Sequence, residues 1–304
     1  MTQSDNWSKF AHVSRGLHAD AAEGMTTMEF FYDIFRYGYL ANALLAAVFA
    51  GITCGIVGTY VVSRRMVFLC GGVTHASFGG LGIAFWLGAN PISGAMVFAV
   101  LSAVGIEWAS NRGRIREDSA IGIVWSIGMA TGALFMSLTP GYTSGDLASY
   151  MFGSIVTVTT RDVMTLGALA AFCVAGTLLW QRSVAYLAFD RDFAASQGIA
   201  TKTASYALTV IVAATIVMSI RIMGIVLLLS LFTIPAATAN AFTKSYASIT
   251  LWASVTATAG AVAGLVISYN WEVPPGTGII FILTLGLIVA KLLTLRRKRI
   301  ADAT

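Results

Sequence analysis

Nine apolar stretches constrain this sequence more than any other feature. Short polar segments separate them, and they cover roughly residues 40–62, 66–88, 91–109, 119–138, 163–180, 204–220, 223–242, 247–269 and 277–295. A helix of about 20 predominantly apolar residues spans the hydrocarbon core of a bilayer. Charged residues make up 11% of the 304 residues, whereas a soluble domain has about 25%. The sequence therefore predicts an all-α integral membrane protein built as a polytopic helix bundle.

Basic residues set the expected orientation of the helices. With nine spans, the main basic clusters share one face, which the positive-inside rule assigns to the cytoplasm together with the C-terminus. Glycine or proline interrupts the second and seventh spans, so eight helices are the alternative count. The clusters are Arg64-Arg65, Arg112 to Arg116, Arg182 to Lys202, Lys244 and Arg296 to Arg299.

The composition divides the chain into three parts. Residues 1–38 form a polar tail that ends in an aromatic, interfacial helix, residues 39–296 carry the spans, and residues 297–304 are a basic cytoplasmic tail. The cysteines lack CxxC or CxxH spacing and lie in apolar stretches, so we interpret them as packing residues. Close contacts between spans are predicted by three GxxxG pairs, which begin at Gly51, Gly128 and Gly260.

A hydrophilic island, YLAFDRDFAASQGIATKT, separates the fifth and sixth spans at residues 186–203. Its charged residues surround a small apolar face that includes Phe193 and Ala194, and Gly198 supplies a helix stop. A connecting loop needs no such helix. We therefore predict a short amphipathic helix that docks onto a cytoplasmic partner.

His75 is the only histidine within an expected span, and it lies in the glycine-rich stretch LCGGVTHASFGGLG. Ionisable groups inside a bilayer are costly and often mark a substrate path. Imidazole is also a good ligand for a borderline transition metal. The sequence favours a place on a substrate path, with the glycines lining a cavity wall. The alternative is a neutral histidine hydrogen-bonded between helices.

Three other positions are candidates for structural or path roles. Glu107, at the end of its span, is interpreted as an interfacial structural group. Glu272, in NWEVPPG, is either a solvated loop carboxylate or a group at the outer mouth of a path. Pro235 either breaks its span beside a water-filled path or only kinks it.

Sequence motifs of soluble enzymes are absent. The chain has no GxxxxGK[ST], GxSxG or HExxH motif and no cluster of cysteine and histidine ligands. These motifs carry phosphate binding, nucleophilic catalysis and zinc hydrolysis. We therefore expect no enzyme activity and no ATP or nucleic acid bound by this chain. An ion gradient or another subunit must supply the energy for any work it performs.

Six stretches, in this order, resemble the permease subunits of ABC importers for chelated zinc, manganese and iron. The resemblance covers nearly the whole chain from about residue 38 to 290. The stretches are RRMVFLCGGVTHASFGG (64–80), REDSAIGI (116–123), DLASYMFGSIVTVTTRDV (146–163), LAFDRDFAASQGI (187–199), GIVLLLSLFTIPAATANAF (224–242) and SYNWEVPPG (268–276).

This resemblance implies a homodimeric, multi-pass permease of the bacterial cytoplasmic (inner) membrane. Its implied partners are a cytoplasmic ABC ATPase subunit, which binds ATP and Mg, and an external metal-binding protein. The metal ion is then the substrate, and this chain holds no cofactor. Residues 187–199 match the coupling helix that docks into the ATPase, with contacts expected from Asp190, Asp192, Phe193, Ala194, Gly198 and Ile199.

The resemblance also identifies a departure in the second span. Family members typically carry an Asp four residues before the His of this span, and here that position is Gly71. Residues at i and i+4 share a helix face, so the missing carboxylate would have joined His75 at a metal. Cys70 is a softer candidate ligand, but it points about 140° away from His75 on an ideal helix. The expected path residues are His75, as the metal ligand, with Cys70 and Glu272.

Zinc or manganese is the expected cargo, with ferrous iron as a further candidate. Because the Asp is missing, a metal chelate or another small solute is one alternative. A stand-alone carrier that couples to protons through His75 is the other, although the chain shows no convincing inverted repeat of the kind many such carriers have.

Overall fold

The computed structural model describes residues 32–34, 36–112, 116–139, 158–271 and 274–301, and all regular structure in this part of the chain is helical. Nine segments of these residues are long and apolar enough to cross a membrane. The all-α polytopic fold is therefore confirmed. The helices are α3 (Gly38–Ser63), α4 (Val67–Trp86), α5 (Pro91–Asn111), α6 (Glu117–Ser137), α8 (Thr160–Phe189), α9 (Arg191–Ser196), α10 (Thr201–Phe242), α11 (Tyr246–Trp271) and α12 (Pro275–Ala301).

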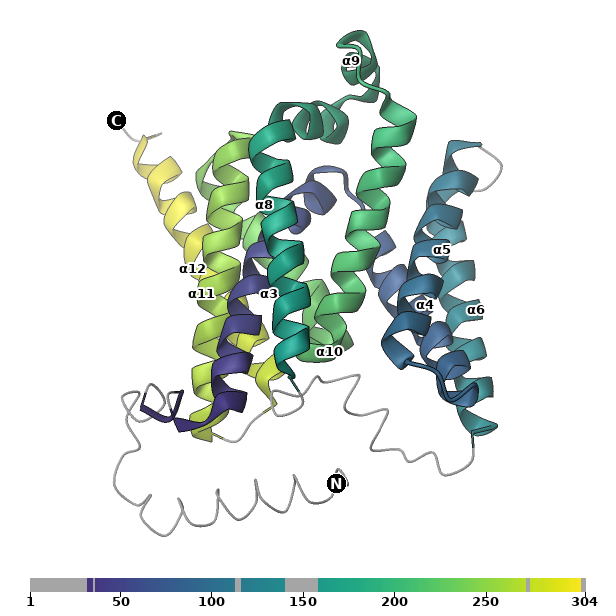
Figure 1. The fold of residues 1–304 in the computed structure, drawn as a ribbon. Helices are drawn as coiled ribbons and strands as arrows, with labels where there is room; N and C mark the ends of the chain where they lie inside the picture. Colours follow the sequence, from purple (N-terminus) through teal and green to yellow (C-terminus); the bar gives the residue numbers. More distant parts are fainter. Residues whose placement is uncertain (1–31, 35, 113–115, 140–157, 272–273, 302–304) are drawn as a thin grey trace.

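Helix α10 contains two of the nine spans and reverses between them at Gly224. The rings of Phe189, at the end of α8, and Tyr246, at the start of α11, are in edge contact with centroids 6.1 Å apart. The two ends of α10 therefore lie at the same end of the bundle, next to the end of α8 and the start of α11. The two halves of α10 run in opposite directions (Figure 1). Gly224 has φ 76° and ψ 167°, a conformation essentially reserved for glycine. Helical geometry continues through Pro235, so of the two alternatives for this residue the break is excluded.

Helices α4, α5 and α6 pack through glycine. Helix α4 makes its most extensive contacts with α6 and α5. A Cβ atom built on Gly79 would lie 2.8 Å from the carbonyl oxygen of Gly128, and one built on Gly82 would lie 2.6 Å from that of Gly132. Gly80 meets the α5 backbone in the same way. Only glycine allows so close an approach, and we refer to α4, α5 and α6 as the glycine-packed unit.

The predicted GxxxG contacts are confirmed in all three cases. The pair that begins at Gly128 faces α4, as described above. Gly51 and Gly55 of α3 lie against the backbone of α11 at Thr258 and Ser254. The pair that begins at Gly260 packs against α12. Small residues thus set the closest helix approaches in this bundle.

One end of the bundle carries α9, the facing ends of α5 and α6, and the C-terminal end of α12 (Figure 1). Arg64 also lies there, because its Nη1 donates to the carbonyl oxygen of Leu187 at 3.3 Å. These segments contain the basic clusters that were expected on one face. Helix α12 continues through its basic run to Ala301, and most of the expected polar tail, residues 1–31, falls outside the described residues.

Candidate functional site

The short helix α9 starts at a well-formed cap. The backbone of Asp190 is extended, with φ −149° and ψ 108°, and separates α9 from α8. Its Oδ1 accepts hydrogen bonds from the backbone N–H groups of Asp192 at 2.9 Å and Phe193 at 3.0 Å. An aspartate at this position satisfies backbone donors that a helix leaves free. The side chain of Asp190 is therefore occupied with holding the helix.

Helix α9 ends at the predicted glycine. Gly198 has φ 80°, and the Ile199 N–H donates to the Ala194 carbonyl oxygen at 3.2 Å, as in a glycine-terminated helix. The helix is shorter than the predicted 187–199. Its residues are Arg191–Ser196, because α8 continues to Phe189 before the cap at Asp190 interrupts it.

The two sides of α9 differ in character. Ala194 is fully buried against the bundle, whereas Asp192 is exposed. Phe193 is 46% exposed, and its ring meets the Tyr186 ring edge-on with centroids 5.0 Å apart. Figure 1 shows α9 projecting beyond the ends of the neighbouring helices. This helix thus offers a charged and aromatic surface away from the bundle.

A partly buried ion pair connects α9 to α5. Glu107, near the end of α5, is 4% exposed, and its Oε1 accepts from Arg191 Nη2 at 2.7 Å. Ser205 Oγ donates to the same oxygen at 2.6 Å and accepts from Arg191 Nη2 at 2.8 Å. Asn111 accepts from Arg191 Nη1 at 2.9 Å and donates to Glu107 at 3.2 Å. We call these four residues the α5–α9 clamp.

The clamp gives Glu107 the structural role that the sequence suggested, but its partner was missed. In the sequence, Arg191 is one of several basic residues in the cluster from Arg182 to Lys202. It lies 84 positions beyond Glu107, and no spacing rule relates residues that far apart. A carboxylate at the end of an apolar span is the one available signal, because such a group must find a partner when it is buried.

His75 of α4 is half-buried and stacks on Trp125 of α6, with ring centroids 4.3 Å apart and planes inclined by 6°. One helical turn earlier, Gly71 faces open space, with no atom within 4 Å of an added Cβ. Cys70 is 1% exposed and belongs to the apolar core. The structure therefore does not bring Cys70 and His75 together, and Glu272 falls outside the described residues.

The other glycines around His75 do not line a cavity. Gly72 faces Ile121 of α6, with an added Cβ 2.5 Å from the Ile121 Cγ2. Gly79, Gly80 and Gly82 face α5 or α6 within the glycine-packed unit. The expectation of a glycine-lined wall is corrected on this point, because the glycines bring helix backbones together. Within the described residues, no three His, Cys, Asp or Glu side chains gather as a metal site would require.

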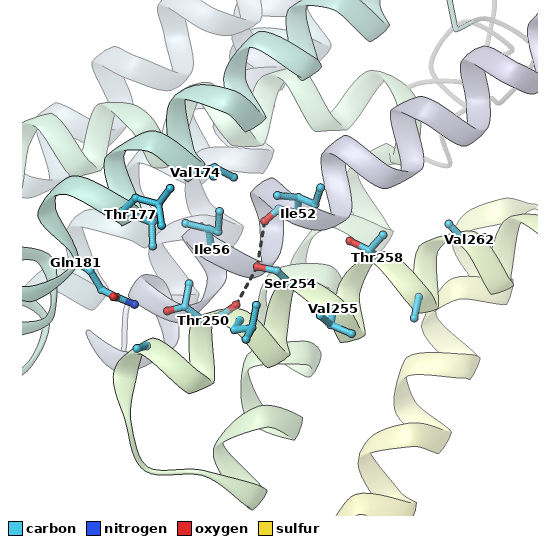
Figure 2. A pocket seen from close by; sticks show the side chains of 14 residues that line it. Ile52, Ile56, Val174, Thr177, Gln181, Thr250, Ser254, Val255, Thr258 and Val262 are labelled. Carbon is cyan, nitrogen blue, oxygen red and sulfur yellow. Dashed lines mark hydrogen bonds between the residues drawn. The ribbon is translucent and has the colours of Figure 1, made fainter.

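A groove of about 750 Å³ lies between α3, α8 and α11, on residues remote in sequence from His75 (Figure 2). We call it the lateral groove. Its surface is mainly apolar, and Ser254 Oγ within it donates to the Thr250 carbonyl oxygen at 2.9 Å. Neither His75 nor Cys70 lines it. Aliphatic walls suit lipid chains better than a divalent cation, which prefers imidazole, thiolate or carboxylate ligands.

Comparisons with known proteins point to metal transport. A model of the ABC 3 transport family matches residues 36–294. The chain is 34% identical to a probable metal transport system membrane protein of Chlamydia muridarum, over 90% of this chain and 94% of that protein. It is 30% identical to the manganese transport system membrane protein MntC of Halalkalibacterium halodurans, over 85% of this chain and 88% of that protein. PsaBC from Streptococcus pneumoniae, solved in complex with Fab, matches with a TM-score of 0.80 at 27% identity, covering 90% of this chain and 100% of that chain.

Proposed function

Because this chain belongs to the ABC 3 transport family, whose model matches residues 36–294, we propose that it is the membrane subunit of an importer for zinc or manganese, with ferrous iron as a further candidate. The family match carries this proposal. Nine candidate spans in the described residues support it. A separate ATPase subunit hydrolyses ATP, an external binding protein delivers the metal, and two copies of this chain form the path in the bacterial cytoplasmic membrane.

Helix α9 is the proposed docking element for the ATPase. It projects from the end of the bundle that carries the basic clusters (Figure 1), which is the cytoplasmic end by the positive-inside rule and includes the C-terminal end of α12. Asp192 and Phe193 are exposed on it, while Asp190, Ala194, Gly198 and Ile199 hold its shape. The ATPase therefore contacts the first pair directly and depends on the others for the geometry of the helix.

Charge reversal on α9 tests this docking. We expect Asp192→Arg to reduce co-purification of the ATPase by about tenfold, or about 1.4 kcal/mol, because reversing an exposed charge in an interface disrupts its electrostatic complementarity. The matched control is Lys202→Glu, a reversal at an exposed residue on the first turn of α10. Unchanged capture of the ATPase by Asp192→Arg would remove α9 from the interface.

His75 is the proposed metal ligand of the path. Its ring is held against Trp125, and the open space at Gly71 lies one turn away on the same helix face. The space leaves room for a water or for a ligand carried by the cargo. It also favours a second candidate, a permease for a metal chelate, since a chelate brings its own carboxylates.

Metal uptake into proteoliposomes is the experiment that tests the function. The chain, its ATPase and its binding protein are reconstituted together, and zinc, manganese and ferrous iron are offered in parallel. We expect ATP-dependent uptake of one metal, lost in His75→Ala and retained in Ser126→Ala, an exposed neighbour of Trp125. Full uptake by His75→Ala would mean that His75 only packs between helices and does not bind the metal. An assembled, ATP-hydrolysing complex that moves no free ion would favour the chelate.

A further inference from the structure

The α5–α9 clamp has no necessary part in forming α9 or its outer surface. The Asp190 cap, the Gly198 stop and the buried Ala194 fix α9 in position between α8 and α10. Its closest backbone neighbours are these same two helices, to which it is joined along the chain. Arg191 also donates to Ser205 of α10, and it reaches beyond these two helices to Glu107 and Asn111 of α5. The clamp thus links α9 to a helix that is distant in the sequence.

We propose that Glu107 and Arg191 are positioning residues that make α5 move with α9, and so connect the ATPase to the glycine-packed unit that carries His75. The identity of the partner on α9 rests on the proposed function, whereas the clamp itself is a property of this chain. Movement of α9 reaches α8 and α10 through the covalent chain. Helix α10 packs against α5 and α4, and the clamp adds a direct polar link from α9 to α5.

The geometry of the clamp suits the transmission of force. Arg191 uses Nη1 and Nη2 on three acceptors from α5 and α10, and the planar guanidinium fixes their relative directions. Glu107 is buried and the Arg191 side chain is 37% exposed, so water and salt screen this pair less than they screen a fully exposed one. Rotation of α9 therefore cannot break one bond without straining the others.

The receiving helices are built to move together. Gly80 of α4 lies against the backbone of α5, and Gly79 and Gly82 lie against that of α6. Backbones in direct contact have no intervening side chains that could change rotamer and absorb a displacement. A shift of α5 therefore carries α4, and with it the His75–Trp125 stack, as one body.

Two variants and their combination test the proposal in the assembled complex. Glu107→Gln and Arg191→Gln each remove one charge, and the double variant removes the pair without leaving a buried charge alone. We expect each to retain ATPase capture and ATP hydrolysis while metal moved per ATP falls about tenfold, within the range of coupling between protein sites. The double variant should fall no further than the worse single one, because both act through one contact.

The control is Lys202→Gln, which removes an exposed charge just beyond α9 and outside the clamp. It should keep the wild-type ratio of metal to ATP. A merely structural role for Glu107 and Arg191 would reduce assembly or hydrolysis and leave that ratio unchanged. An unchanged ratio in the assembled double variant overturns the proposal.

A second measurement needs no transport. In the full-length chain in lipid nanodiscs, amide hydrogen exchange of α5 and α9 reports whether the two are joined. We expect faster exchange near residues 107–111 and 191–196 in the double variant. In Lys202→Gln the exchange rates of these residues should equal those of the wild type. Wild-type protein that moves no metal, together with this exchange pattern, would reject the proposed function and keep the clamp. Identical exchange in the wild type and the double variant would reject the clamp.

Discussion

The glycine-packed unit and the lateral groove are two sides of one bundle with opposite packing. In the unit, an added Cβ on Gly79 or Gly82 would lie within 3 Å of a backbone atom of α6. Around the groove, the side chains of α3, α8 and α11 leave about 750 Å³ unfilled (Figure 2). By this packing the unit can move only as a body. Helices α3 and α11 also meet backbone to backbone at Gly51 and Gly55, so on the groove side it is α8 that has free space beside it. We infer that the glycine-packed unit transmits helix movements, whereas the groove side can absorb them.

Helix α10 lies between these sides and contacts both α4 and α5 of the unit and α3 beside the groove. Its reversal at Gly224 is therefore placed to join a rigid region to a compliant one. On the groove side, α8 also departs from helical geometry at Trp180, with φ −122° and ψ 17°. The helices of the unit have no such interior departure among their described residues.

The largest expected effect comes from filling a backbone contact in the unit. A leucine at Gly128 would force its Cβ to within 2.8 Å of the Ala76 carbonyl oxygen, so we expect Gly128→Leu to destabilise the fold by about 3 kcal/mol or more. The control is Gly122→Leu on the same helix, where no atom lies within 4 Å of a Cβ. Thermal unfolding in detergent measures this through exposure of the three buried cysteines. Equal melting of the two variants would show that the unit is not tightly packed.

A smaller effect is expected at the reversal of α10. Alanine at Gly224 must adopt φ 76°, which costs about 1–3 kcal/mol for a residue with a Cβ. Gly176→Ala on α8 is the matched control, because it is helical with open space around it, and there alanine should stabilise by up to about 1 kcal/mol. Opposite signs in the two melting shifts are the expected result. A shared sign would mean that the turn has another conformation.

The sequence was sufficient for the fold because apolar length and charge are local properties. Each span could be located from its own residues, and the GxxxG pairs correctly marked three helix contacts. The Gly198 stop was equally local, since it needs only a backbone conformation that other residues avoid. The residues around His75 were harder, because glycine serves both to line cavities and to bring backbones together.

Contacts between side chains on different helices could not be predicted from the sequence pattern. Glu107 was recognised as structural, yet nothing local to α5 indicates that Arg191 would reach it. The stacking of His75 on Trp125 is equally invisible, since it depends on how α4 and α6 are rotated against each other. The lateral groove likewise results from side chains on three helices that the sequence does not place side by side. Long-range geometry, rather than composition, decides all three.

The smallest effect is expected in the lateral groove, and it tests the other half of the comparison. Val174 of α8 lines the groove and is 37% exposed, so the extra methylene of Val174→Leu has space beside it. We expect the free energy of unfolding, followed through the melting temperature, to change by no more than about 0.5 kcal/mol, as for substitutions outside packed cores. Ala99→Leu on α5, where Ala99 is fully buried, should instead be costly, since it enlarges a side chain that has no free volume around it. Comparable losses at the two positions would mean that the groove closes in the membrane, and the contrast between a rigid and a compliant side would then disappear.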